Sequence, residues 1–345
     1  MNHNFFTYKK HFQQLFIILS LFLTFIKIDV FAEEQNEQSL NEFYADFMEL
    51  LDTEAIHKDS QEWKEFYSNY QNSDKNYTSF SSLYFDLYDA VKIAGGKHSQ
   101  LARADAGFEK RETDFYEYPA IEELDNGIIH ITIPSTYYFL AFAINEVDLI
   151  QSEEYQHYIE SVLDYIRNNK DKIKGFIIDL RDNYGGFDLP MIQATHFLFN
   201  DGKLLEFVNA DEEDAGYMEL KQNTLIQSRE EEYKLNIQRI EKIDVPVAIL
   251  INQYTGSAGE FLCIMIKDAN IENNKTFGEN TGGFTSDNNL YRLPIGNNYY
   301  VNLTVGYPKS ITGKIYKEEP IEPDVETETP LEDAIEWLNE MIKKE

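Results

Sequence analysis

The chain has 345 residues, and 61 acidic against 30 basic side chains give it a net charge of −31 at pH 7. This length allows two domains or one large domain with an extension, and the charge argues against binding to nucleic acid or to anionic membrane surfaces. Cys263 is the only cysteine, which excludes a disulfide framework within the chain. Its place in an apolar segment indicates a buried small side chain rather than a nucleophile.

Residues 1–32 are predicted to be a secretory signal peptide. Lys9 and Lys10 precede an apolar segment, 15–26, that is too short to span a bilayer. Val-Phe-Ala at 30–32 resembles a cleavage site. We therefore expect an exported protein, secreted or held at the cell surface, with no stable membrane insertion once the signal is cleaved. Export without disulfides indicates a bacterial protein. The alternative is an uncleaved N-terminal anchor.

Residues 33–104 are predicted to form an N-terminal helical segment, because apolar side chains recur there at helical spacing. A glycine pair at 95–96 ends its third helix. Residues 105–345 are predicted to form one α/β catalytic domain, because strands and helices alternate. Region 208–236 is acidic and weakly periodic, and it is interpreted as a surface excursion or lid. The expected elements are a turn at 125–127, strands at 128–133, 174–180 and 247–251, helices at 146–170, 188–199 and from 257, paired strands within 287–306 with a turn at 296–298, and a helix from 330.

The strand at 247–251 leads through a short polar turn to Ser257, and a helical pattern follows. The first N–H groups of a helix lack partners, and the helix dipole favours negative charge there. This position would suit an alkoxide and an oxyanion. The alternative is a purely structural role, since Ser257 and Glu260 also match the S/T-x-x-E capping box.

Three further segments contain glycine pairs. Residues 179–186 read Asp-Leu-Arg-Asp-Asn-Tyr-Gly-Gly after a predicted strand, and 95–99 read Gly-Gly-Lys-His-Ser. Residues 278–283 read Gly-Glu-Asn-Thr-Gly-Gly, and Glu-Pro-Asp follows at 322–324. Glycine pairs permit positive φ and close approach of another chain, as an oxyanion hole requires. Of the seven histidines, His98 is placed best for a general base; its alternative is an exposed side chain without a catalytic role.

In this order and spacing, these segments and the serine turn resemble the C-terminal processing, or tail-specific, serine peptidase family. The similarity is greatest to the branch that includes the tricorn protease core. It implies an α/β fold with a ClpP- or crotonase-like catalytic core, preceded here by the N-terminal helical segment. The chain leaves no room for the separate PDZ domain that many tail-specific proteases carry.

The resemblance implies that Ser257 is the nucleophile. It also implies that the backbone N–H groups of Gly185 or Gly186 and of Ala258 hold the oxyanion. In the Ser–Lys branch of the family a lysine downstream of the serine is the base. The corresponding position here is Gly282, so the resemblance does not support a Ser–Lys mechanism.

In the tricorn-like branch the base is a histidine in a Gly-x-His-Ser segment, and His98 matches it. That histidine is oriented through a serine and a late glutamate. An ungapped match places Lys317 at the glutamate position, so Glu319 or its neighbour Glu318 fits only after a shift of one or two residues. The residue before His98 is a lysine rather than the orienting serine, and Ser99 is the substitute.

The predicted reaction is hydrolysis of extended polypeptides through an acyl-enzyme on Ser257, with His98 as general base. It requires no metal or cofactor, and no His-x-x-x-His spacing occurs. The alternative function is a catalytically silent member of the same fold that binds a peptide or a small ligand. An esterase of the α/β-hydrolase type is excluded, because Thr-Gly-Ser-Ala-Gly at 255–259 lacks the first glycine of that motif and no histidine follows His196.

Overall fold

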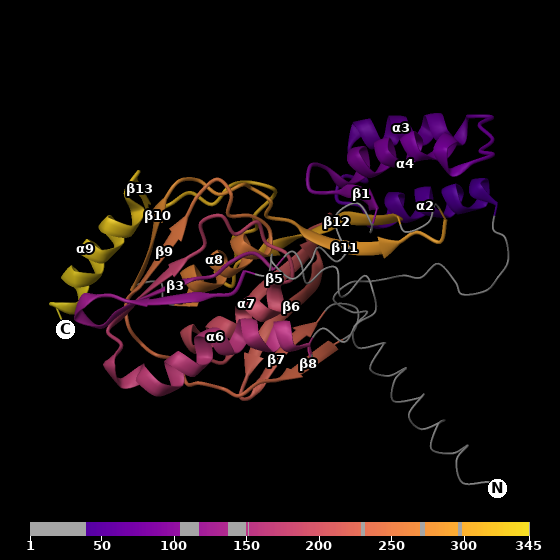
Figure 1. Ribbon diagram of the computed structural model, residues 1–345. Coiled ribbons are helices and arrows are strands. Elements are labelled where there is room, and N and C mark those ends of the chain that lie inside the picture. The colour runs from indigo at the N-terminus through magenta and orange to yellow at the C-terminus, as the bar shows by residue number, and fades with distance from the viewer. Residues whose placement is uncertain are drawn as a thin grey trace, which may run out of the picture.

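The computed structural model describes residues 39–103, 117–136, 150, 152–228, 232–269, 273–295 and 299–344. The predicted signal peptide, the start of the helix expected at 146–170 and the turn at 296–298 lie outside these ranges, as does the proposed boundary at 104/105. The described residues form two β-sheets with helices packed against them (Figure 1). In none of the helices within these ranges is there an apolar stretch long enough to cross a bilayer.

The first sheet is the centre of the α/β core, and all its pairings except that of β2 with β3 are parallel. Its strand order is β13–β10–β9–β4–β3–β2. The strands are β2 (Ala120–Glu123), β3 (Ile128–Thr132), β4 (Gly175–Asp179), β9 (Val247–Ile251), β10 (Asn274–Gly278) and β13 (Val325–Glu326). The turn predicted before β3 is present as the short 3-10 helix η2 (Asp125–Gly127), with Asn126 at φ 64°.

Both faces of the central sheet are covered, which explains why its inner strands are almost continuously apolar. On one face Ile177 of β4 and Leu250 of β9 pack with Leu338 of α9 (Pro330–Ile342). On the other face Phe176 and Ile178 belong to the main core, which includes the apolar sides of three helices. These helices are α6 (Glu153–Asn169), α7 (Asp188–Thr195) and α8 (Ala258–Ala269), and the short 3-10 helices η4 (Lys170–Lys172) and η5 (His196–Leu198) follow α6 and α7.

The second sheet is antiparallel, in the order β1–β12–β5–β6–β7–β8, with β11 also paired to β12. Its strands are β1 (Gln100–Arg103), β5 (Gly202–Asn209), β6 (Asp214–Lys221), β7 (Thr224–Ser228), β8 (Glu232–Asn236), β11 (Asp287–Arg292) and β12 (Tyr299–Lys309). The interpretation of 208–236 as a surface excursion or lid is therefore wrong. Its apolar residues alternate along short strands, and Met218, Leu220 and Leu225 reach the main core.

The N-terminal helices are α2 (Leu40–Glu54), α3 (Gln61–Gln71) and α4 (Phe80–Gly95), as the periodicity predicted. Ser39, Ser60 and Ser79 cap their N-termini. They lie at the opposite end of the molecule from α9 (Figure 1). Their core, around Trp63 and Leu87, includes Tyr291 of β11 and Leu303 of β12. β11 and β12 therefore anchor the helices α2 to α4, and the loop after α4 is held beside the antiparallel sheet.

Candidate active site

The glycine-containing segments meet at one edge of the central sheet. β4, β9 and β10 are parallel neighbours, so the residues that follow them emerge at the same edge. Gly256 N–H donates to the carbonyl of Asn183 at 2.9 Å, which joins the loop after β9 to the loop after β4. Gly282 N–H donates to the carbonyl of Thr255 at 2.8 Å, which adds the loop after β10. These bonds bring together segments that are far apart in the sequence.

Ser257 lies at the centre of this edge, immediately before α8, with φ at 53°. A positive φ is unusual for a residue with a side chain, and such positions concentrate at functional sites. Gly185 packs directly against it: a Cβ on Gly185 would lie 2.6 Å from Ser257 Cβ and 2.9 Å from Ala258 N. With φ at +88°, Gly185 also has a backbone that favours glycine. The glycine pair thus allows one loop to reach the serine turn.

The predicted capping box at this helix is only half formed. Ser257 N–H donates to Glu260 Oε2 at 3.0 Å, which is the glutamate half of the motif. The Ser257 hydroxyl has no hydrogen-bond partner among the described residues, so it does not cap the helix. The glutamate therefore takes the capping role and leaves the hydroxyl free.

Glu260 also fixes the loop after β10, and sequence reasoning assigned it only a cap. Its side chain is completely buried. Its Oε1 accepts from the Thr281 hydroxyl and, at 2.9 Å, from Gly283 N–H. Burial raises the pKa of Glu260 to about 7, although its hydrogen bonds to Thr281, Gly283 and Ser257 oppose the shift. The buried carboxyl group of Glu260 thus connects the serine turn to the loop after β10, which includes Phe284.

The two predicted oxyanion positions on the glycine loop are not equivalent. Gly185 N–H donates to Asn183 Oδ1 at 2.9 Å, so it is already engaged. The N–H groups of Gly186 and Ala258 have no partner within the described ranges. Of the three predicted N–H donors, those of Gly186 and Ala258 are thus available, whereas Gly185 permits close packing against the serine turn.

His98 lies in the loop between α4 and β1 and is half-buried. Its Nδ1 is 2.7 Å from the hydroxyl of Ser286, a buried residue just before β11. Burial lowers the pKa of His98 to about 4, with Lys97 and Lys92 adding to the effect and Glu318 opposing it. A neutral imidazole that donates from Nδ1 to Ser286 keeps Nε2 as a free base. The serine hydroxyl that contacts this ring nitrogen belongs to Ser286, whereas the sequence suggested Ser99.

Ser99 itself has a structural role. It is fully buried, and its hydroxyl donates to the carbonyl of Gly95 at 2.8 Å and accepts from Thr304 N–H at 2.8 Å. These bonds join the end of α4 to β12. All the hydrogen bonds of its hydroxyl are made to Gly95 and Thr304, and none is made to His98.

The two candidate glutamates lie in different surroundings. Glu318 is mostly buried; its Oε2 is 3.5 Å from His57 Nε2, and its Oε1 is buried without a partner among the described residues. Its carbonyl accepts from Lys97 Nζ at 2.9 Å. Glu319 instead pairs with Lys314 at 3.3 Å and is half-exposed. The structure favours Glu318 over Glu319 as the carboxylate that acts on His98.

Phe284 links the histidine side of the site to the serine side. Its ring centroid lies 5.2 Å from that of His98, and Lys97 Nζ is 5.2 Å from the same centroid. Phe284 Cδ2 is 3.5 Å from where a Cβ on Gly256 would stand. No hydrogen bond joins Ser257 to His98 in this structure.

Sequence reasoning missed Ser286, Phe284, His57 and the full role of Glu260. Ser286 and Phe284 directly follow the quoted glycine pair at 282–283, so proximity in sequence to a motif was the available signal. His57 gave no such signal, because the fold brings the α2–α3 loop to Glu318. No cluster of metal-ligating side chains occurs within the described ranges.

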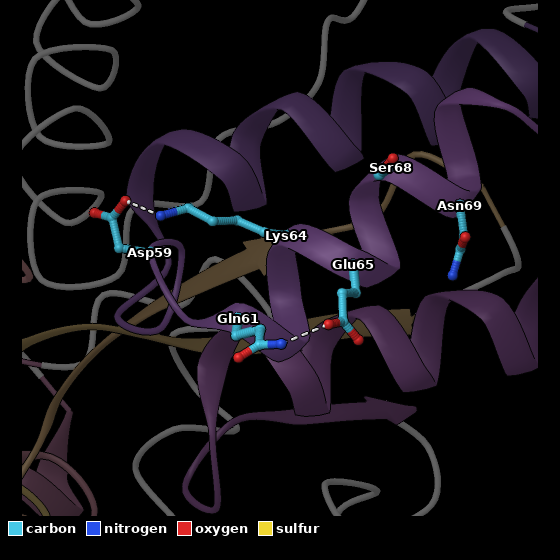
Figure 2. A pocket seen from close by; sticks show the side chains of 6 residues that line it. All are labelled: Asp59, Gln61, Lys64, Glu65, Ser68 and Asn69. Atoms are coloured by element: carbon cyan, nitrogen blue, oxygen red, sulfur yellow. Dashed lines mark hydrogen bonds and ion pairs between the residues drawn. The ribbon is translucent and has the colours of Figure 1, made fainter.

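A hollow on the helical segment lies elsewhere, along α3 (Figure 2). It measures about 680 Å³ and is shallow, with six polar residues lining it: Asp59, Gln61, Lys64, Glu65, Ser68 and Asn69. Asp59 pairs with Lys64 at 3.0 Å and Gln61 donates to Glu65 at 2.8 Å, as Figure 2 shows. Four of the six residues thus satisfy one another, and none belongs to the loops around Ser257.

Comparisons with known proteins identify the family. Residues 142–327, more than half of the chain, match the model of Peptidase family S41. The chain is also 32% identical, over 294 residues, to the nisin-resistance protein of Lactococcus lactis subsp. lactis, with 85% of each chain covered. The chain belongs to peptidase family S41. The resemblance found in the sequence is thereby confirmed, and the chain is a peptidase at the level of its family.

Solved structures confirm the fold of this S41 peptidase. It resembles a lipoprotein from Streptococcus agalactiae with a TM-score of 0.67 and 22% identity, over 90% of this chain and 99% of that one. It also resembles a photosystem II D1 C-terminal processing protease, with a TM-score of 0.52 and 12% identity, over 85% and 94% of the two chains. The expected α/β core of the tail-specific protease type, preceded by helices, is therefore correct.

Proposed function

We propose that this S41 peptidase is a serine endopeptidase in which Ser257 is the nucleophile and His98 the general base. The observation that carries the proposal is the serine turn itself. Ser257 lies at the start of α8 with a positive φ, and its hydroxyl has no hydrogen-bond partner among the described residues because Glu260 takes the capping role. The unpaired N–H groups of Gly186 and Ala258 are in adjacent segments, as the oxyanion requires.

The reaction follows from the protonation states. His98, neutral because burial lowers its pKa, takes the hydroxyl proton on Nε2 as Ser257 Oγ attacks the peptide carbonyl carbon. The tetrahedral oxyanion then accepts hydrogen bonds from Gly186 and Ala258. Collapse breaks the C–N bond, and His98 returns its proton to the leaving amine. Water, deprotonated by His98, hydrolyses the acyl-enzyme. Ser286 holds the ring through Nδ1 throughout.

The proposed substrate is an extended, positively charged polypeptide. The net charge of −31 disfavours acidic substrates. The Lactococcus lactis relative bears the name of resistance to nisin, and it is 32% identical to this chain. We therefore include nisin among the substrates to be tested. Export to the cell surface, as the sequence of residues 1–32 predicts, would place the enzyme where it meets peptides from outside the cell.

Ser257→Ala is the decisive variant. Incubation with nisin and with a mixture of unmodified peptides, followed by mass spectrometry, should show new termini for the wild type and none for the variant. Circular dichroism should show the same fold in both, because Ser257 is only partly buried. Cleavage at an unchanged rate by the variant would disprove the assignment of the nucleophile.

A second function is favoured by one observation, the lack of a Ser257–His98 hydrogen bond. A catalytically silent member of the fold would bind peptides without cleaving them. Labelling with a fluorophosphonate separates the two functions. An enzyme should be labelled at Ser257, and the His98→Ala variant should be labelled at least about a hundredfold more slowly, because it lacks the general base. Unlabelled wild-type protein that still binds peptide would establish the silent alternative.

A further inference from the structure

Aromatic side chains are exposed around the serine turn. Among the described residues six large apolar side chains are exposed, and three of them lie in the loops that surround Ser257: Tyr184 at 60%, Tyr254 at 47% and Phe284 at 36%. Exposed aromatic rings on a soluble protein concentrate at sites that bind ligands or partners. Their position beside a peptidase nucleophile points to the substrate.

Tyr184 and Tyr254 form a pair. Their ring centroids are 5.7 Å apart with the planes inclined at 46°. Tyr184 directly precedes Gly185, whose Cα lies against Ser257, and Tyr254 is three residues before that serine. The two rings come from different loops, after β4 and after β9. A substrate residue bound by them would therefore lie close to the scissile bond.

Asn252 fixes the loops that carry the pair. Its Oδ1 accepts from the N–H groups of Asp182 and Tyr254, each at 3.1 Å, and its Nδ2 donates to Asp182 Oδ1 at 3.0 Å. The carboxylate of Asp182 is exposed, and its backbone has φ at 61°. The pair is therefore accompanied by a negative charge whose position is set by the backbone of both loops.

The other charged groups near the ring pair leave its surroundings negative. Glu279 is exposed, and its N–H donates to the carbonyl of Ile251, next to Asn252. Arg181, the nearest cation in the sequence, is neutralised by Asp179 through a contact of 2.6 Å. Phe284 already has Lys97 over its ring, whereas no cation of the described residues lies over Tyr184 or Tyr254. An electron-rich ring pair attracts a cation, and the nearby carboxylates of Asp182 and Glu279 form no salt bridge among the described residues.

We propose that Tyr184, Tyr254 and Asp182 form a subsite for a lysine or arginine side chain of the peptide substrate. The proposal rests on the proposed peptidase function and names the residue type selected beside the scissile bond. The rings contact the alkyl stem and the cation, and Asp182 supplies the opposite charge. The subsite explains why two large rings stay exposed where packing would otherwise bury them.

The test uses peptides that are identical except for lysine or norleucine at one position, moved residue by residue along the sequence. Norleucine keeps the alkyl stem and removes the charge. For the wild type, lysine at one position should raise kcat/KM over norleucine by about threefold to tenfold. Tyr184→Leu and Tyr254→Leu should each reduce that preference, Tyr184→Phe should retain it, and Asp182→Asn should reduce it. Tyr88→Leu is the matched control, since Tyr88 is 41% exposed on α4.

The outcomes separate the subsite from the peptidase function. Hydrolysis by the wild type with a lysine preference that survives in both leucine variants would overturn the subsite alone. If the wild type cleaves no peptide, the peptidase proposal fails, and binding of fluorescently labelled forms of the same peptides to Ser257→Ala protein still tests the subsite. Equal affinity for the lysine and the norleucine peptide would overturn the proposed subsite. A further measurement is co-sedimentation with phosphatidylcholine–phosphatidylglycerol vesicles. If the protein bound the vesicles, lost this binding in Tyr184→Leu and showed no lysine preference, the rings would bind a membrane and the proposed subsite would be overturned.

Discussion

The serine side and the histidine side of the site are built in different ways. On the serine side, Ser257, Gly186 and Ala258 follow neighbouring parallel strands, and Glu260 connects the loops from inside α8. On the histidine side, His98 follows α4 and is held by Ser286 from the segment before β11. The first arrangement is determined by one sheet edge, whereas the second depends on how two sheets and the helical segment pack. The serine side should therefore be sensitive to local sterics, and the histidine side to single long-range contacts.

Gly185→Ala should have the largest effect and would test the steric claim for the serine side. The added Cβ would lie 2.6 Å from Ser257 Cβ and 2.7 Å from the carbonyl of Gly256, at φ +88°. Displacement of the nucleophile by a fraction of an ångström should lower kcat by about a hundredfold. The free energy of unfolding should fall by about 1–3 kcal/mol. Peptide hydrolysis and urea denaturation measure the two effects.

Gly313→Ala is the matched control. Gly313 has φ at +100°, but nothing lies within 4 Å of a Cβ at this position. It should show the cost of the strained backbone, about 1 kcal/mol, with unchanged kcat. If both alanine variants behaved alike, the contact between Gly185 and Ser257 would have no catalytic importance.

Ser286→Ala should have the next largest effect and would test the histidine side. Without a partner at Nδ1 the ring loses its fixed tautomer and orientation, and kcat should fall by about tenfold to a hundredfold with little change in KM. Ser99→Ala is the comparison, because Ser99 is also a buried serine next to His98 but bonds only to Gly95 and Thr304. It should lower the free energy of unfolding by about 1–3 kcal/mol and leave kcat unchanged. The reverse result would restore Ser99 as the orienting residue.

The same contrast explains what the sequence could predict. The strand before Ser257, the helix after it and the glycine pairs are local patterns, and each element formed where the periodicity placed it. The role of Ser286 could not be read in this way, because 188 residues separate it from His98. The pairing of β1 and β11 with β12 brings the two together, and Glu260 and Glu319 fix the segment just before Ser286. The strands β5 to β8 within 202–236 were missed because they are short and contain many charged residues.

Glu260→Gln examines how the serine side responds to pH. Burial raises the pKa of Glu260 from its ordinary 4.5 to about 7, so the folded state binds this proton more tightly than the unfolded chain. The associated stabilisation is fully present below pH 4.5 and is lost as the pH rises through about 7, on the order of 3 kcal/mol in total. The variant should lack this slope, and urea denaturation across that range measures it. Glu319→Gln, at an exposed position, should keep the wild-type slope; a slope that also persists in Glu260→Gln would contradict the assignment.

Glu318→Gln should have the smallest effect and bears on the carboxylate of the histidine side. Glu318 opposes the fall in the pKa of His98, so its neutralisation should lower that pKa further below about 4. The acidic limb of the kcat/KM profile, on which His98 loses its proton as the pH rises, should move to lower pH. A less basic imidazole should also lower the rate at neutral pH by about twofold to fivefold.

Glu319→Gln is the control and should leave both the acidic limb and the rate at neutral pH unchanged, since Glu319 pairs with Lys314 at the surface. The opposite result, a shift of the acidic limb in Glu319→Gln and not in Glu318→Gln, would assign Glu319 to the glutamate that orients the histidine in the tricorn-like branch. The loop that carries Glu319 would then have to rearrange when substrate binds.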